Sequence, residues 1–186
     1  MFNALRQRFI RVVMAAAVAG PWLLMLPSLS LSGCATAPSA PQVPALMVED
    51  FRVPSNAAGI ELFVRNKRPT GVETFPSNRI VLFVHGITFP SESTFDLSLD
   101  GLSWMDYIAQ AGYDVYLVDV RGYGGSTRPA AMSEPPDRNP PIATLTEAVD
   151  DVDAAVNFIL RQRNVGRINL IGWSCGSVVM GRYTAT

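Results

Sequence analysis

Five residues near the end of the printed sequence, Gly172-Trp173-Ser174-Cys175-Gly176, place a serine hydroxyl between two glycines. Such a hydroxyl is a weak nucleophile unless its oxygen is openly presented and a base lies beside it. A sharp turn from a strand into a helix presents the oxygen, and small residues two places before and after the serine avoid clashes there. The pattern therefore predicts that Ser174 is a nucleophile and that the backbone N–H of Cys175 stabilises an oxyanion.

Two other interpretations of the same five residues are possible. Cys175 could be the nucleophile, but Trp173 would then occupy one of the positions that need a small residue. The segment could also be an ordinary turn that contains glycine and has no catalytic role. An apolar strand at 167–172 and an apolar start to the next helix at 177–180 favour the nucleophile.

The elements that would position Ser174 follow from the apolar pattern. Short apolar runs bounded by turn residues predict buried strands at 79–84, 113–120 and 167–172, and a hairpin is expected from 47–53 and 60–66. Helices are predicted at 102–111, ending at Gly112, and from a capping box of Thr144 and Glu147 to near Asn164. The second helix carries apolar residues at helical spacing: Val149, Val152, Val156, Ile159 and Leu160. This alternation predicts an α/β fold, a mainly parallel sheet with helices on both faces.

Three segments in this order resemble the α/β-hydrolase superfamily: RIVLFVHGITFPSESTF, GYDVYLVDVRGYGGSTRP and INLIGWSCGSVVMG. The resemblance covers about residues 51–186. It implies a serine esterase or lipase-like enzyme in which the backbone N–H of Ile87, after the His-Gly pair, joins that of Cys175 in an oxyanion hole. It also implies a catalytic triad in the chain order serine, acid, histidine.

His85 is the only histidine in the sequence, and it precedes Ser174. The family order therefore assigns it a structural role in shaping the oxyanion loop, and not the role of base. Asp150, Asp151 and Asp153 also precede Ser174, and their helical spacing predicts a solvated face. We therefore expect the sequence to be the N-terminal part of a longer hydrolase, truncated after the nucleophile elbow. These residues alone would lack the triad acid and histidine and would be inactive.

The N-terminus resembles that of a bacterial lipoprotein. Arginines precede an apolar stretch at 12–31, which leads into Leu31-Ser32-Gly33-Cys34, a sequence similar to a lipobox. The expected organisation is a signal peptide at 1–33, a Pro/Ala-rich tether at 34–46 beginning with lipidated Cys34, and the hydrolase domain at 47–186. A transmembrane anchor is the alternative, but two prolines and a small-residue end favour a cleaved signal. We expect an exported protein, lipid-anchored on the periplasmic side of the bacterial outer membrane.

Composition narrows the set of partners. A net charge of −1 gives no reason to expect nucleic acid, and two cysteines with one histidine are too few for a usual zinc site. We expect no metal and no cofactor. A glycine-rich segment at 122–125 follows a strand, but the prolines after it disfavour dinucleotide binding. The expected partners are a small-molecule ester or acyl substrate and a membrane.

The predicted function is cleavage of carboxylic esters through an acyl-enzyme at Ser174. The alternatives are a non-catalytic lipoprotein fragment, a decayed gene product, and an acyltransferase or thioesterase of the same fold.

Overall fold

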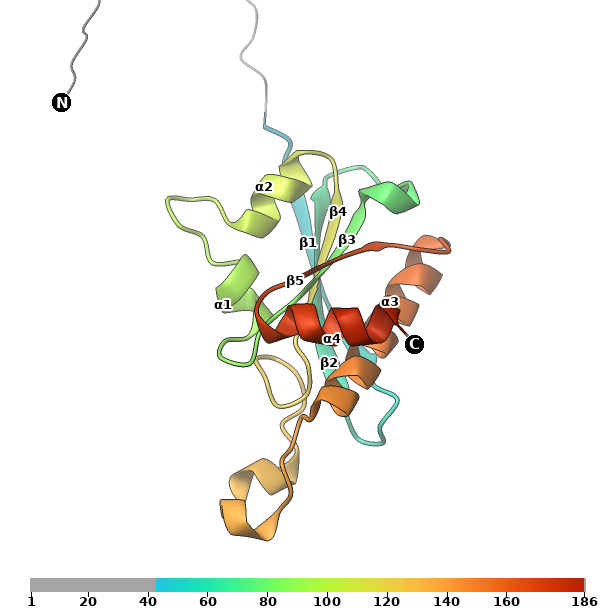
Figure 1. Ribbon diagram of the computed structural model, residues 1–186. Coiled ribbons are helices and arrows are strands. Elements are labelled where there is room, and N and C mark those ends of the chain that lie inside the picture. Colours follow the sequence, from blue (N-terminus) through green and yellow to red (C-terminus); the bar gives the residue numbers. More distant parts are fainter. Residues whose placement is uncertain (1–42, 186) are drawn as a thin grey trace, which may run out of the picture. The chain divides into compact units, whose positions relative to one another are not determined.

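The computed structural model describes residues 43–185, so the expected signal peptide, Cys34 and most of the tether lie outside the described residues. The described chain forms one five-stranded sheet in the order β1-β2-β4-β3-β5 (Figure 1). The strands are β1 (Leu46–Pro54), β2 (Glu61–Pro69), β3 (Ile80–Val84), β4 (Asp114–Val118) and β5 (Asn169–Gly172). All five were expected from the apolar pattern.

The sheet combines an antiparallel part and a parallel part. β1 and β2 form the expected hairpin, with Leu46 opposite Pro69 and Pro54 opposite Glu61, and β2 is antiparallel to β4. β3 runs parallel to both β4 and β5. The carboxyl ends of these three strands therefore lie at one edge of the sheet, where open α/β sheets bind ligands.

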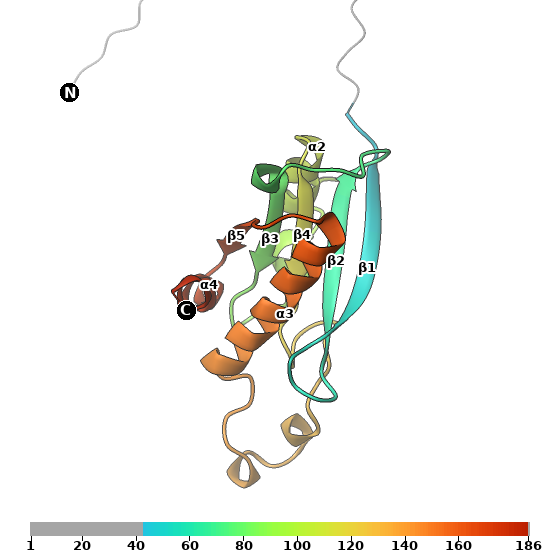
Figure 2. The same ribbon diagram turned by 90° about the vertical axis from the view of Figure 1, so that its right-hand side faces the viewer.

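Helices cover both faces of the sheet. They are α1 (Ser91–Phe95), α2 (Trp104–Gln110), α3 (Leu145–Arg163) and α4 (Cys175–Thr184). Successive side chains of a strand point to opposite faces. Phe83 of β3 accordingly packs with α1 and α2, whereas its neighbours Leu82 and Val84 pack with α3 and α4. Figure 2 shows α3 crossing the front of the sheet, with α4 beside it. The predicted α/β fold class is confirmed.

Local capping explains where the helices begin and end. The predicted capping box of α3 is present, because Thr144 Oγ1 accepts from the Glu147 N–H and Glu147 Oε2 accepts from the Thr144 N–H at 2.8 Å. The helix ends at Asn164, which is left-handed with φ 51°. α2 begins two residues later than expected, at a second box formed by Ser103 and Asp106. α1 was not predicted, because a helix of five residues is too short to show an apolar period.

A long loop joins β4 to α3 and projects away from the sheet (Figure 1). It contains two short 3₁₀ turns, η2 (Ala130–Ser133) and η3 (Pro136–Arg138), among the prolines that predicted a loop here. A third 3₁₀ turn, η1 (Ser77–Arg79), leads into β3. Among residues 43–185, no helix combines the length and the apolarity needed to cross a bilayer.

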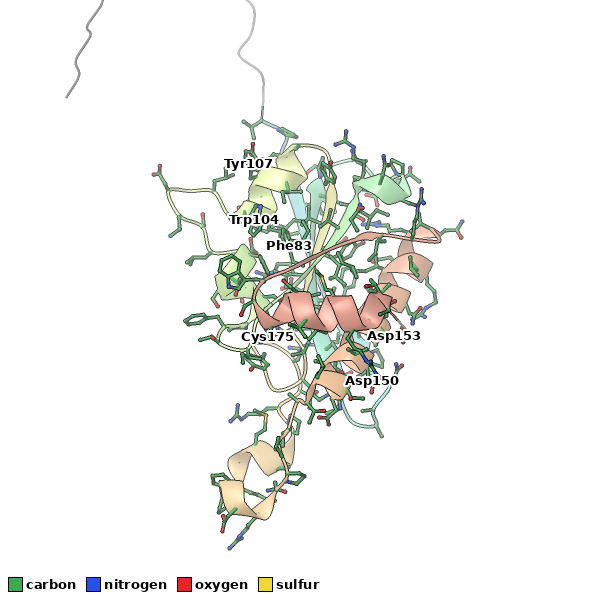
Figure 3. The ribbon with its side chains drawn as sticks, viewed as in Figure 1. Phe83, Trp104, Tyr107, Asp150, Asp153 and Cys175 are labelled. Atoms are coloured by element: carbon green, nitrogen blue, oxygen red, sulfur yellow. The ribbon has the colours of Figure 1, made fainter. Side chains whose placement is uncertain are left out.

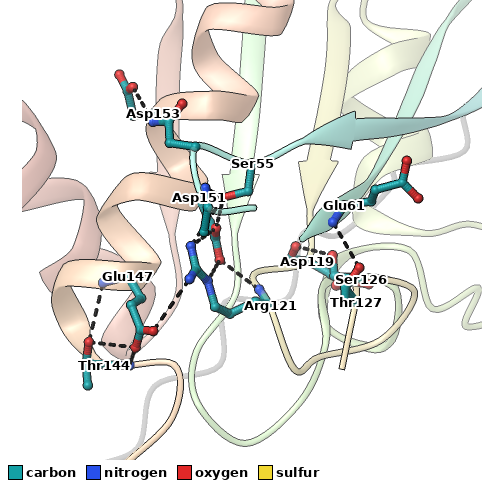
Figure 4. A network of polar contacts seen from close by, with 12 residues as sticks. Ser55, Glu61, Asp119, Arg121, Ser126, Thr127, Thr144, Glu147, Asp151 and Asp153 are labelled. Atoms are coloured by element: carbon teal, nitrogen blue, oxygen red, sulfur yellow. Dashed lines mark hydrogen bonds and ion pairs between the residues drawn. The ribbon is translucent and has the colours of Figure 1, made fainter. Parts of the chain in front are cut away.

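The prediction of a solvated face for Asp150, Asp151 and Asp153 is wrong for Asp151. Asp150 is exposed, but Asp151 is fully buried. Its two carboxylate oxygens accept hydrogen bonds from Nε and Nη2 of Arg121 at 2.9 and 2.6 Å, and Ser55 donates to it at 2.7 Å (Figure 4). A buried carboxylate needs such a partner. Arg121 supplies it from the loop after β4, a contact between distant segments that helical spacing cannot reveal.

Candidate active site

Ser174 lies at the turn between β5 and α4, in the strained conformation that a nucleophile elbow requires. Its φ is 54° and its ψ is −124°, a region that costs a residue other than glycine about 1–3 kcal/mol. The turn is held by the Trp173 N–H, which donates to the Val84 carbonyl at 3.0 Å, and by the Gly176 N–H, which donates to the Trp173 carbonyl at 2.8 Å. The side chain of Ser174 is exposed at the carboxyl edge of the sheet.

The two glycines around Ser174 are required by close backbone approach. A Cβ on Gly172 would lie 2.6 Å from the backbone nitrogen of Ser177. A Cβ on Gly176 would overlap the Val84 carbonyl oxygen and lie 2.6 Å from that of His85. The start of α4 can therefore pack directly against the end of β3, as the pattern of two flanking glycines predicted.

Two backbone N–H groups beside Ser174 have no hydrogen-bond acceptor among residues 43–185: those of Ile87 and Cys175. Cys175 is the first residue of α4, so its N–H has no acceptor within the helix (Figure 3). Both residues line one cavity of about 30 Å³. A neighbouring cavity of about 110 Å³ is lined by Ser174 and Gly86. The structure thus brings Ser174, Ile87 and Cys175 together around Gly86.

His85 follows β3 directly, and both of its ring nitrogens are engaged by backbone groups. The Val120 N–H donates to Nε2 at 3.1 Å, so Nε2 acts as an acceptor and carries no proton. Nδ1 then carries the proton and donates to the Gly86 carbonyl at 2.5 Å. Burial lowers the pKa of His85 below its usual value. His85 is therefore held neutral, and neither nitrogen is free to accept the proton of Ser174, which fits the structural role expected from the sequence.

The contact between His85 and Gly86 also orients the amide of Ile87. The Gly86 carbonyl and the Ile87 N–H belong to one peptide unit, and no cis peptide bond occurs among the described residues. In a trans peptide the C=O and the N–H point in opposite directions. Because His85 holds the carbonyl, the Ile87 N–H points away from the imidazole ring.

Asp119 ties the loop after β4 to the start of α1, directly after the loop that follows β3. Its side chain is buried and accepts from the Ser91 N–H at 2.7 Å and from the Gly125 N–H at 2.9 Å. Ser126 donates to the Asp119 carbonyl at 2.5 Å (Figure 4). Asp119 and Ser126 belong to the segment that carried the family resemblance, and the contact of Asp119 with Ser91 fixes this segment against the end of the loop beside Ser174.

The surroundings of Ser174 are largely apolar. Ile87, Phe89 and Trp173 are 67%, 63% and 59% exposed around it. The remaining lining residues of the 110 Å³ cavity, Thr88 and Thr94, add two hydroxyls. Sequence reasoning missed Thr88, Phe89 and Thr94, and their only signal was proximity to the His-Gly pair. Among the residues described, no three His, Cys, Asp or Glu side chains are grouped to hold a metal ion.

The fold and this arrangement of residues define an α/β hydrolase. The family model described as the alpha/beta hydrolase fold matches residues 79–186, more than half of the sequence. The chain belongs to the α/β-hydrolase family. A comparison of the sequence with curated proteins found no match.

Solved structures share the fold at low identity. An esterase of the fungus Rhizomucor miehei has 20% identity and a TM-score of 0.50, with 77% of this chain and 39% of that chain covered. Esterase Est22 has 19% identity and a TM-score of 0.50, with 72% and 37% covered. A prolyl endopeptidase has 15% identity and a TM-score of 0.51, with 74% and 19% covered. The chain therefore spans less than half the length of each of these three proteins.

Proposed function

We propose that the protein is a serine hydrolase that cleaves carboxylic esters through an acyl-enzyme at Ser174. The observation that carries the proposal is the position of the Ser174 hydroxyl, exposed on a turn with φ 54° beside the two free N–H groups of Ile87 and Cys175. An exposed hydroxyl next to two free amides is the arrangement that acyl transfer requires. The apolar rim of Ile87, Phe89 and Trp173 suits the hydrocarbon part of an acyl substrate.

In the proposed reaction, Oγ of Ser174 bonds to the acyl carbon while its proton passes to a base. The carbonyl oxygen becomes an oxyanion that accepts hydrogen bonds from the amides of Ile87 and Cys175, each worth about 3 kcal/mol in comparable sites. The bond to the alcohol then breaks, and the alcohol leaves with the proton. Water then attacks the acyl carbon while the base takes its proton. The bond to Oγ breaks, the carboxylic acid leaves, and the proton returns to Ser174.

The base in this proposal is a histidine of the longer protein, of which we expect the printed sequence to be the N-terminal part. His85 is unsuited because both of its nitrogens are engaged by Val120 and Gly86. His85 instead acts by orienting the Ile87 amide.

The test uses the intact protein and a fluorophosphonate, which bonds covalently to activated serines. We expect peptide mass spectrometry to locate the adduct on Ser174. Ser174→Ala should abolish labelling and should lower kcat for p-nitrophenyl esters by about 10⁶-fold, as removal of the nucleophile does in a comparable triad.

Cys175→Ala is the matched control, because Cys175 contributes its backbone amide and not its thiol. We expect this variant to keep most of the labelling and turnover. An adduct on Cys175, or turnover that survives Ser174→Ala, would show that Ser174 is not the nucleophile.

We further propose that lipidated Cys34 attaches the protein to a membrane, on the periplasmic side of the bacterial outer membrane. The support is the N-terminal sequence: a basic start, an apolar stretch and Leu31-Ser32-Gly33-Cys34. The segment at 35–45 after the cysteine contains three prolines and four alanines and would act as an extended tether.

A further inference from the structure

The loop that carries Ile87 has little support of its own. Ile87, Thr88 and Phe89 lie between β3 and α1 in no helix or strand. The side chains of Ile87 and Phe89 are mostly exposed. Among residues 43–185, no backbone N–H of these three residues donates a hydrogen bond. The loop position must therefore be fixed by contacts from other segments.

One side chain from another segment reaches this loop with a hydrogen bond. The hydroxyl of Tyr123, in the loop after β4, donates to the Ile87 carbonyl at 2.6 Å. The ring of Tyr123 packs against His85, with a distance of 4.7 Å between ring centroids and an angle of 51° between their planes. Tyr123 also lines the 30 Å³ cavity that Ile87 and Cys175 line.

Tyr123 and His85 together hold both peptide units that flank Ile87. His85 holds the Gly86 carbonyl, which fixes the peptide containing the Ile87 N–H. Tyr123 holds the Ile87 carbonyl, which fixes the next peptide. Because both peptide planes are held, the backbone at Ile87 cannot rotate without losing a hydrogen bond. The Ile87 N–H therefore keeps the direction, away from the imidazole ring, that the contact with His85 gives it.

We propose that Tyr123 is a positioning residue of the oxyanion hole, holding the Ile87 amide where the oxyanion of the reaction forms. This inference rests on the proposed function at Ser174. Tyr123 bonds to the Ile87 carbonyl and packs on His85, so it acts through the main chain of Ile87. Without its hydroxyl, the loop would adopt several conformations, of which only some direct the amide at the oxyanion.

The test compares Tyr123→Phe with Tyr116→Phe in the intact protein. Tyr123→Phe keeps the ring against His85 and removes the hydroxyl alone. Tyr116→Phe is the matched control: its hydroxyl donates to Gln162 Oε1 at 3.0 Å, a hydrogen bond between β4 and α3 and not to the Ile87 loop. Both variants lose one tyrosine hydrogen bond. Equal thermal midpoints would show that any difference in kinetics does not come from unfolding.

We expect Tyr123→Phe to lower kcat for p-nitrophenyl esters by about 10- to 100-fold, less than the loss of a whole oxyanion donor. KM should change little, because the amide binds the oxyanion more strongly than the ground-state carbonyl. The affinity for a boronic acid, which forms a tetrahedral adduct on serine, should fall by a similar factor. Tyr116→Phe should leave kcat and boronate affinity near those of the unsubstituted protein.

Each result decides a different question. If the unsubstituted protein shows no hydrolysis that depends on Ser174, the proposed function and this inference are both overturned. If the protein is active and Tyr123→Phe matches Tyr116→Phe in kcat and boronate affinity, only the role of Tyr123 is overturned. A rise in KM with unchanged kcat would likewise contradict a positioning role in the transition state.

Discussion

The backbone N–H of Val120 donates a hydrogen bond to Nε2 of His85 across 3.1 Å. Val120 follows β4 and His85 follows β3, so this bond joins the carboxyl ends of two neighbouring parallel strands. The bond also favours the neutral imidazole, because a protonated Nε2 would be a donor facing another donor, the Val120 N–H.

The burial of His85 predicts a dependence of stability on pH. Burial lowers the pKa of His85 in the folded protein below the 6.5 of an exposed histidine. Between pH 6.5 and the lowered pKa, the imidazole is protonated in the unfolded chain and neutral in the folded chain. The contribution of His85 to stability is therefore complete above pH 6.5 and is lost as the pH falls towards the lowered pKa. The expected loss is up to about 1.4 kcal/mol per pH unit, measured by urea unfolding.

His85→Gln is the control for this pH dependence. The sequence holds no other histidine. The described carboxylates with lowered pKa values, Asp50, Asp106 and Glu147, have ordinary values of 3.8 to 4.5 and lose their contribution below that range. We therefore expect the variant to show little change in stability between about pH 5 and 6.5. If the free energy of unfolding changed equally with pH in both proteins, His85 would not be the source of the pH dependence.

Gly176→Ala should destabilise the fold. A Cβ at this position overlaps the Val84 carbonyl, and both partners are backbone atoms that cannot move aside as a side chain can. Overpacking of this kind costs about 1–3 kcal/mol. Gly181→Ala in the same helix is the control, because a Cβ there meets nothing within 4 Å, and it should stabilise α4 by about 0.5–1 kcal/mol. Denaturant unfolding measures both, and a neutral Gly176→Ala would contradict the packing of α4 on β3.

Asp151→Ala should destabilise the protein by about 3–5 kcal/mol, because it leaves the guanidinium of Arg121 buried without its main partner. The side chains of Asp151 and Arg121 are 0% and 6% exposed. Asp150→Ala, at the exposed neighbour on α3, should change the free energy of unfolding little. Similar losses for the two variants would show that the contact between Arg121 and Asp151 is not a major source of stability.

Cys34→Ala should block signal cleavage and should release the protein from the membrane fraction. We expect metabolic labelling with palmitate to mark the unsubstituted protein in the membrane fraction and to be absent from the variant. Cys175→Ala, which removes the other cysteine of the sequence, should keep the label. Labelling that persists after Cys34→Ala would contradict lipidation at this residue.

The sequence predicted best those features that depend on neighbouring residues. The strands, the capping box of Thr144 and Glu147 and the turn at Ser174 follow from apolar runs, local hydrogen bonds and glycine spacing. The contacts of Asp151 and Tyr123 could not be predicted, because each joins residues about thirty positions or more apart. Tyr123 lies in the glycine-rich segment at 122–125, and nothing in that segment indicates where its hydroxyl points.

The loop between β4 and α3 is tied to the rest of the fold near its ends and projects beyond these contacts (Figure 1). The ion pair of Arg121 and Asp151 and the cap at Thr144 hold its two ends. Between these ends, the Asn139 side chain donates hydrogen bonds to Glu134 and Ala131 of the same loop. Exposed loop tips of this kind tolerate inserted sequence. A reporter peptide or affinity tag placed between Glu134 and Asn139 would therefore mark the protein in its native compartment while leaving the sheet and the turn at Ser174 intact.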